Sequence, residues 1–181
     1  KAFLNYLKWI DAIRDLPNFP QIEVPQPSFR WLGFKDQAKI LSEIPDGDKP
    51  IFTFLFYSGC RPCEARSLRV KDVDLHNEVI IIRTHFSDNT IVVNRKGKKA
   101  PPVVIPIHDD LKPILAARIK GQLPEAFVFT NPRTGRPYYR KTLNQMWDKV
   151  RRKLNLDKSI RLYDATRHSF ASNLVNKNVS I

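Results

Sequence analysis

The sequence of 181 residues, 42% of them hydrophobic, is long enough for one main domain with a buried core. Its 31 lysines and arginines against 18 aspartates and glutamates give a formal charge of +13, which predicts a polyanionic partner, with nucleic acid the leading class. No apolar run approaches the roughly 20 residues that span a bilayer, and two cysteines cannot form a disulfide scaffold, so we expect a soluble, cytoplasmic protein without a membrane partner.

Residues 1–16 predict one amphipathic helix, because apolar side chains recur there at helical spacing. Four prolines after it exclude regular structure and predict a Pro-rich linker over 17–33. The single methionine is Met146, so we expect a fragment whose first helix is the tail of an upstream domain. Residues 34–181 then form the main domain.

The main domain alternates helical and strand-like segments. Helices are predicted over 34–44, from Pro50 to a stop at Gly59, from Pro62 onward, and over 109–120, 139–154 and 164–176. Strand-like runs at 78–84, 90–94 and 102–107, the last two joined by a turn around Gly97, predict a small antiparallel three-stranded sheet. The fold class is therefore α+β and mainly α.

Arg61 stands at an unusual place for a cation. It precedes Pro62, which pushes it out of the helical region and makes it the N-cap of the next helix. A cation at the positive end of a helix suggests an anion held jointly by the guanidinium and the helix terminus. Glu64 lies at the third helical position, where a capping-box role is the preferred interpretation.

Arg167 shares a largely apolar helical stripe with Asp164, Ala171 and Leu174. A buried guanidinium without a partner is costly, so Arg167 either pairs with Asp164 one turn away or meets an anion from outside. From these residues alone, the Asp164 ion pair is the favoured interpretation.

Two basic stretches are candidate phosphate contacts. Four cations, Arg95, Lys96, Lys98 and Lys99, surround Gly97 in the predicted hairpin turn, where a lysine can reach a phosphate or donate a proton to a leaving oxygen. Lys149, Arg151, Arg152, Lys153, Lys158 and Arg161 form the second stretch. Either stretch can also be a solvated surface, but the overall charge favours contacts of the second with a phosphate backbone.

Cys60 and Cys63 have the C-x-x-C spacing of redox and metal sites. Neither the parallel sheet of a thioredoxin-type site nor a second pair of zinc ligands is predicted. The preferred interpretation is two small, half-buried residues that flank Arg61.

Together these features resemble the tyrosine recombinase, or phage integrase, family. Its members carry an arginine in a T/S-G-x-R-x-x-E-x-x-x-L box, a lysine in a β-hairpin and an H-x-x-R-H-T/S-F-A box. Here the boxes read Ser58-Gly59-Cys60-Arg61-Pro62-Cys63-Glu64 through Leu68, then Lys96-Gly97-Lys98 leading to Val104-Ile105-Pro106-Ile107, then Asp164-Ala165-Thr166-Arg167-His168-Ser169-Phe170-Ala171. The order is that of the family, and the match covers residues 34–181.

The resemblance implies the family's helical catalytic domain, a C-shaped clamp on double-stranded DNA. A tyrosine would attack a backbone phosphate and form a 3'-phosphotyrosyl link, with no metal and no cofactor. Arg61 and Arg167 would hold the nonbridging oxygens, and Lys96, with Lys98 as the fallback, would protonate the leaving 5'-oxygen. The residues expected to contact DNA are Arg95, Lys98, Lys99, Arg151, Arg152 and His168. Full-length members act as tetramers on DNA.

The sequence departs from the family pattern at two places. Asp164 replaces the usual histidine; it can accept a proton or orient Arg167, but it cannot supply a positive charge. All five tyrosines, Tyr6, Tyr57, Tyr138, Tyr139 and Tyr163, precede Arg167, whereas the family's nucleophile follows it. We therefore expect a chain that lacks the C-terminal segment with its nucleophile and is inactive alone.

Three alternatives to a recombinase or integrase stay open. A decayed relative would bind DNA without cutting it. A type IB topoisomerase shares the chemistry, although the short hairpin and the R-H-S-F box favour recombinases. A C-x-x-C redox protein would depend on Cys60 and not on Arg61.

Overall fold

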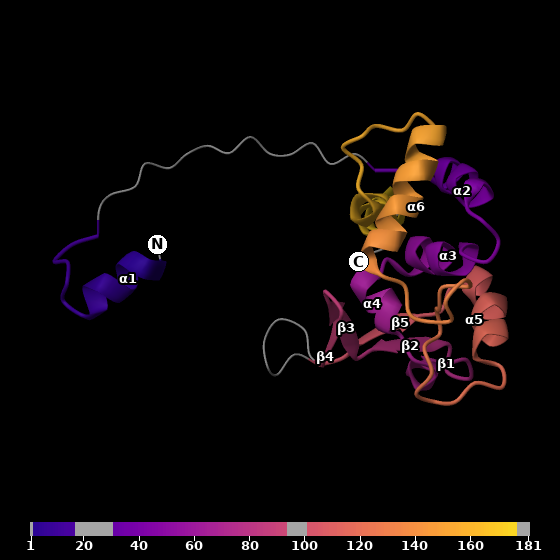
Figure 1. Ribbon diagram of the computed structural model, residues 1–181, viewed down its shortest axis with the longest axis horizontal. Coiled ribbons are helices and arrows are strands. Elements are labelled where there is room, and N and C mark those ends of the chain that lie inside the picture. The colour runs from indigo at the N-terminus through magenta and orange to yellow at the C-terminus, as the bar shows by residue number, and fades with distance from the viewer. Residues whose placement is uncertain (1, 17–30, 94–100, 177–181) are drawn as a thin grey trace.

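The computed structural model describes residues 2–16, 31–93 and 101–176 (Figure 1). In chain order the elements are α1 (Ala2–Trp9), α2 (Phe34–Glu43), α3 (Lys49–Ser58), α4 (Pro62–Ser67), the 3-10 turn η1 (Val70–Asp72), β1 (Val73–Asp74), β2 (Val79–Ile82), β3 (Thr84–Ser87), β4 (Thr90–Val93), β5 (Val103–Pro106), the 3-10 turn η2 (Asp109–Leu111), α5 (Lys112–Ile119), α6 (Arg140–Lys153), the π turn η3 (Asp164–His168) and α7 (Ser169–Asn176). The predicted α+β class with mainly helical content is confirmed.

Helix α3 forms the centre of the core, because most of its side chains are apolar. Phe52, Phe54 and Leu55 are fully buried. The helix contacts α2, α4, α7 and η3, so it joins the segments that carry both arginine boxes. Figure 1 shows α2, α3 and α6 on one side of α4 and the strands on the other. Helix α4 therefore lies at the junction between the helical part and the sheets.

Helix α6 packs one apolar face on this core. Its Trp147 is 2% exposed, and the indole nitrogen donates a hydrogen bond to the Ile160 carbonyl oxygen at 2.9 Å.

No helix among the described residues is long and apolar enough to span a bilayer.

The three-stranded antiparallel sheet is confirmed, but its predicted membership was wrong. Its strand order is β1-β2-β5, with Ile80 opposite Ile105, while β3 and β4 form a separate two-stranded hairpin. The predicted strand 78–84 is interrupted at Arg83, and Asp88 has a φ of 52° in the two-residue turn that follows β3. Left-handed Asp or Asn is typical of such a turn, which pairs 84–87 with 90–93 locally. The predicted turn around Gly97 lies outside the described residues.

Helix α1 is shorter than predicted. It ends at Trp9, and Asp11 has a φ of 55°, which is a left-handed conformation that a helix cannot continue through. None of its residues is buried. Residues 17–30 of the predicted linker lie outside the described residues, so the proposed domain boundary stays a prediction.

Candidate phosphate-binding site

Arg61 is held at the start of α4 by its two neighbours in the chain. Gly59 ends α3 with a φ of 61°, and Pro62 opens α4 as its first residue. Between them Arg61 is extended, with φ −69° and ψ 144°, as its place before a proline predicted. The chain thus turns sharply and presents the Arg61 side chain at a helix N-terminus.

Glu64 fixes the Arg61 side chain and backbone together. Its Oε2 accepts a hydrogen bond from the Arg61 backbone N–H at 2.9 Å, and its Oε1 accepts one from Arg61 Nη1 at 2.9 Å. Glu64 is 2% exposed, whereas the Arg61 side chain is 41% exposed. The predicted capping role of Glu64 is confirmed, and it also orients the guanidinium.

The environment keeps Arg61 charged. Partial burial lowers its pKa, but hydrogen bonding to Glu64, the Glu64 charge and the Tyr163 hydroxyl outweigh this and leave the pKa raised. An arginine guanidinium has five N–H donors. With one Nη1 bond made to Glu64, the group retains donors for an anion.

Arg167 lies close to the Arg61 segment. Its Nη1 donates a hydrogen bond to the Gly59 carbonyl oxygen at 3.0 Å, although the two residues are 108 positions apart. The expected ion pair with Asp164 was wrong. The Asp164 carboxylate instead accepts from the Arg161 backbone N–H at 3.1 Å and lies 3.7 Å from His168 Nε2.

The reason is the π turn η3, which replaces the first turn of the predicted continuous helix. Hydrogen bonds in a π turn reach five residues back, so positions three apart no longer lie one above the other. Ser169 closes the turn: its Oγ donates to the Asp164 carbonyl oxygen at 3.1 Å and accepts from the Leu32 backbone N–H at 2.9 Å. Asn173, one turn on, donates to the Leu32 carbonyl oxygen at 3.2 Å. These bonds join the start of the main domain to the helix that follows Arg167.

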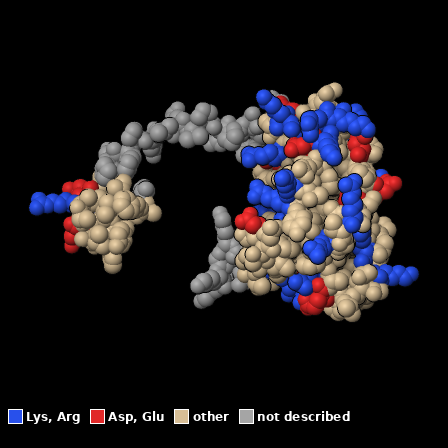
Figure 2. All heavy atoms as spheres, viewed as in Figure 1, with Lys and Arg blue, Asp and Glu red and all other residues tan. Residues whose placement is uncertain are grey.

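A cavity of about 830 Å³ lies beside Arg61. Residues of α4, β3, α6 and the segment around η3 line it, among them the cations Arg61, Arg66, Arg140 and Arg161, the histidines His85 and His168, and the residues Tyr163 and Asp164. Figure 2 shows Lys and Arg side chains over much of the face in view, with fewer Asp and Glu among them. The cavity can therefore receive an anionic ligand that reaches Arg61.

The other predicted residues divide into three groups. Arg95, Lys96, Lys98 and Lys99 lie outside the described residues and stay predictions. His168 lines the cavity, with its ring edge-on to Tyr163 at 5.1 Å. Arg151 lies on α6 in an ion pair with Asp148 at 3.2 Å, and the exposed Arg152 donates to the Asp148 carbonyl oxygen at 3.1 Å.

Sequence reasoning missed Arg66, Arg140 and Tyr163. Arg140 is the first residue of α6, a position where acidic residues are normally preferred, so the signal that drew attention to Arg61 was present there too. Tyr163 stands directly before the second arginine box. Arg66 gave no signal in the sequence, because its hydrogen-bond partners Asp88 and Tyr138 are 22 and 72 positions away.

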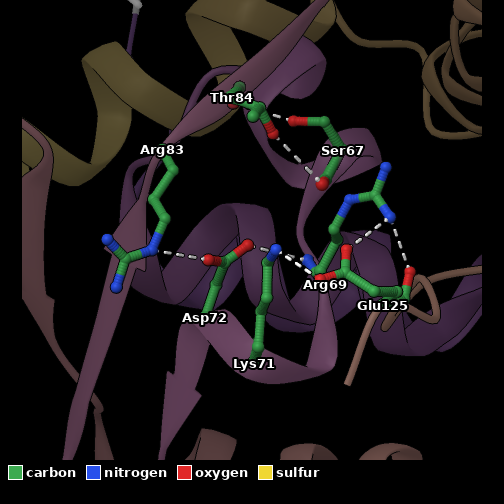
Figure 3. Close-up of polar contacts among 7 residues, drawn as sticks. All are labelled: Ser67, Arg69, Lys71, Asp72, Arg83, Thr84 and Glu125. Atoms are coloured by element: carbon green, nitrogen blue, oxygen red, sulfur yellow. Dashed lines mark hydrogen bonds and ion pairs between the residues drawn. The ribbon is translucent and has the colours of Figure 1, made fainter. Parts of the chain in front are cut away.

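A second polar network ties α4 and η1 to β3, Arg83 and Glu125 (Figure 3). Ser67 Oγ donates to the Thr84 carbonyl oxygen at 2.8 Å, which fastens the end of α4 to β3. The buried Asp72 accepts from Arg83 Nε at 3.0 Å. Arg69 binds both the carbonyl oxygen and the carboxylate of Glu125, at 2.8 Å and 3.0 Å.

The two cysteines are free thiols, with Cys60 buried and Cys63 half-buried. Burial and the neighbouring Glu64 charge raise the pKa of Cys63. A raised pKa disfavours the thiolate that redox chemistry requires. This supports the interpretation of two small residues that flank Arg61, except that Cys60 is fully buried and not half-buried.

Known proteins are similar to this chain in sequence and in fold. The chain is 24% identical over 189 residues to a tyrosine recombinase of Thermosipho africanus (strain TCF52B), covering 99% of this chain and 60% of that protein's length. The fold is similar to the Tn1549 transposon integrase solved in complex with a circular intermediate DNA (TM-score 0.82, 21% identity, 99% of this chain and 65% of that one). It is also similar to XerA recombinase (TM-score 0.62, 19% identity, 84% and 53%).

The family match covers the elements that build the site. Residues 30–181 match the phage integrase family, and this range includes Arg61, Arg167 and every residue of the cavity wall. The chain therefore belongs to the phage integrase family.

Proposed function

We propose that this chain is the larger part of the catalytic domain of a site-specific DNA recombinase or integrase. Such an enzyme cleaves and rejoins DNA through a 3'-phosphotyrosyl intermediate. The supporting observation is the hydrogen bond from Arg167 to the Gly59 carbonyl oxygen, because it brings two arginines from distant boxes to one short stretch of backbone. Two guanidiniums attached to the same stretch of backbone suit the two nonbridging oxygens of one phosphate.

In the proposed mechanism Arg61 and Arg167 bind the scissile phosphate and stabilise the charge of its pentacovalent transition state. Both keep free donors after their protein contacts are made. Lys96, or Lys98 as the fallback, protonates the leaving 5'-oxygen. Asp164 acts as a proton acceptor or orients its neighbour His168, which lies 3.7 Å away.

We infer that the nucleophile is none of the five tyrosines of residues 1–181. Tyr138 is excluded by burial, because its hydroxyl donates to Asp48 Oδ1 at 2.7 Å inside the core. Tyr163 lies in the cavity, but it precedes η3 and interacts with Arg61, which suits a residue that orients the guanidinium. Tyr163→Phe should therefore slow covalent adduct formation in the full-length protein without abolishing it.

The proposed partner is double-stranded DNA. Arg95, Lys98, Lys99, Arg151, Arg152 and His168 are proposed to contact it, and Arg140 joins them because it lines the cavity. We further propose that the full-length protein acts in the cytoplasm as a tetramer on DNA.

The deciding experiment uses the full-length protein that contains residues 1–181. It is incubated with a suicide DNA substrate, and covalent protein–DNA adducts are resolved by denaturing electrophoresis. We expect an adduct from the wild type and none from Arg61→Ala or Arg167→Ala, with both variants folded. DNA binding without any wild-type adduct would overturn the recombinase function and leave a DNA-binding relative.

A further inference from the structure

Arg66 is a buried cation whose described hydrogen bonds go to backbone carbonyls. It is 3% exposed, although it lies in the short helix α4 beside the cavity. Its Nε donates to the Tyr138 carbonyl oxygen, and its Nη2 donates to the Asp88 carbonyl oxygen at 3.3 Å. The guanidinium also lies 4.7 Å above the centre of the Phe86 ring.

These three partners come from two separate segments, of which the hairpin residues Phe86 and Asp88 line the cavity. Phe86 is on β3, Asp88 is in the turn between β3 and β4, and Tyr138 comes two residues before α6. Tyr138 is itself anchored to Asp48, at the start of α3, through its hydroxyl. One guanidinium therefore connects α4, the β3–β4 hairpin and the entry to α6.

The placement of Arg66 is costly. Burial lowers its pKa, and the nearby Arg140 charge lowers it further, against an opposing effect of Cys63. A leucine or methionine would fill the same space without the cost of desolvating a charge. A retained cation with directed hydrogen bonds indicates that the relative position of its partners matters.

We propose that Arg66 is a positioning residue that fixes the β3–β4 hairpin and the start of α6 against the helix that presents Arg61. This inference rests on the proposed recombinase function. By holding these two segments against α4, Arg66 keeps Arg61 in line with the phosphate. It acts through the protein backbone and does not bind DNA.

The test compares Arg66→Met with Arg69→Met in the full-length protein. Arg69 is a matched control, because it also binds a backbone carbonyl, at 2.8 Å, and covers a phenylalanine ring, Phe127 at 4.9 Å. It bonds Glu125 (Figure 3) and does not belong to the described cavity wall. Single-turnover cleavage at saturating DNA and the DNA Kd are measured for each variant at several salt concentrations.

We expect Arg66→Met to cleave about 100-fold more slowly, because a small misplacement of a catalytic group has an effect of that order. Its DNA Kd and salt dependence should match the wild type. Arg69→Met should cleave at the wild-type rate, and Arg66→Lys, which keeps a charged donor group, should recover part of the loss. If Arg66→Met does not fold, Arg66→Lys takes its place, with slower cleavage at unchanged Kd as the expected result.

Two results would overturn the proposal. The first is a folded Arg66 variant that cleaves like the wild type. The second is an Arg66 variant whose slope of log K against log salt is smaller than the wild-type slope by about one, since this would make Arg66 a direct phosphate contact.

Hydrogen exchange separates failure of this inference from failure of the proposed function. The backbone amides of 84–93 should exchange faster in Arg66→Met than in the wild type or Arg69→Met. If the wild type forms no adduct, the recombinase function fails, and the exchange result still decides whether Arg66 fastens the hairpin. An unchanged exchange rate in Arg66→Met would contradict the claim that Arg66 holds the hairpin in place.

Discussion

Arg167 donates a hydrogen bond to the Gly59 carbonyl oxygen at 3.0 Å, and Gly59 lies two residues before Arg61. The second arginine box is thus anchored on the backbone turn that presents the first. The Arg167 guanidinium has one fixed edge, and its other donors are available to a ligand.

Replacement of Arg167 by lysine should separate charge from geometry. An ammonium group cannot bond Gly59 and grip a phosphate in the planar, bidentate way of a guanidinium. We expect Arg167→Lys to slow single-turnover cleavage by at least about 100-fold. Its free energy of unfolding should fall by only about 1 kcal/mol, because one hydrogen bond is lost. Cleavage assays and urea denaturation measure the two effects, and near-normal cleavage would contradict the assigned role.

Gly59→Ala should be strongly destabilising. Its φ of 61° costs a non-glycine residue about 1–2 kcal/mol. An added Cβ would also overlap the Phe170 ring, with the Cγ atom only 2.9 Å away, which adds an overpacking cost of about 1–3 kcal/mol.

Thermal and urea unfolding test this with two companion variants. Phe170→Leu should relieve the overlap, so the double variant should lose less stability than the two single losses added together. Gly33→Ala is the control, because φ at Gly33 is −70° and the nearest atom to an added Cβ is 3.9 Å away. Equal losses for Gly59→Ala and Gly33→Ala would contradict the steric explanation.

Local rules predicted much of the fold and part of the site. The proline after Arg61 predicted its extended N-cap conformation, and Glu64 at the third helical position predicted the capping contact. Helical periodicity failed at Asp164, because the π turn depends on Ser169 reaching Leu32, which lies 137 residues earlier. Arg66 could not be found, because its partners Asp88 and Tyr138 approach it only through the tertiary fold.

The hairpin shows a second limit of sequence patterns. The runs 78–84 and 90–94 have the apolar character of strands, but pattern alone does not say which run pairs with which. The left-handed Asp88 decides this, because it closes β3 on β4 and leaves β2 to pair with β5. Tight-turn chemistry at a single residue therefore outweighed the expected order of pairing.

Glu64→Gln should loosen Arg61 without removing it. The amide keeps the shape of the carboxylate but loses its charge, and hydrogen bonds to charged groups contribute about 1.5–3 kcal/mol. We expect slower cleavage and a lower free energy of unfolding. Asp72→Asn is a matched control, because Asp72 is also 2% exposed and accepts from a backbone N–H, that of Arg69, at 3.2 Å (Figure 3). Asp72→Asn should have a lower free energy of unfolding and a normal cleavage rate. Equal cleavage rates in both variants would contradict a role of Glu64 in positioning Arg61.

Tyr138 should make the fold sensitive to alkaline pH. Burial, and then the hydrogen bond to Asp48, raise its pKa above the ordinary value of 10.0. The folded state therefore holds the phenol proton more tightly than the unfolded chain does. The contribution of Tyr138 to the free energy of unfolding is present below pH 10 and is lost as the pH rises beyond it.

Urea unfolding between pH 7 and pH 11 tests this effect. Tyr138→Phe should be less stable than the wild type at pH 7, because the Asp48 carboxylate loses its donor. The difference should narrow above pH 10. The exposed Tyr139 provides the control, since Tyr139→Phe should follow the wild-type pH profile. A constant difference across the pH range would contradict the titration of Tyr138.

DNA binding by residues 1–181 should weaken steeply as the salt concentration rises. Arg140→Gln should reduce the slope of log K against log salt by about one and weaken binding to all sequences alike. Lys120 is the control, because it is also exposed but follows the last residue of α5 and does not belong to the described cavity wall. Lys120→Gln should change neither quantity; equal effects of both variants would argue against the cavity as the DNA-facing side.

The π turn at 164–168 gives the domain a winding requirement that a loop would not impose. A π turn holds one more residue than the equivalent stretch of α-helix. Winding the same residues as ordinary α-helix would rotate everything after them by about 100°, the angle of one residue. Ser169 and Asn173 would then point away from Leu32, and the domain's opening segment would come loose from its last described helix. The wider turn thus absorbs one residue and sets the phase of α7.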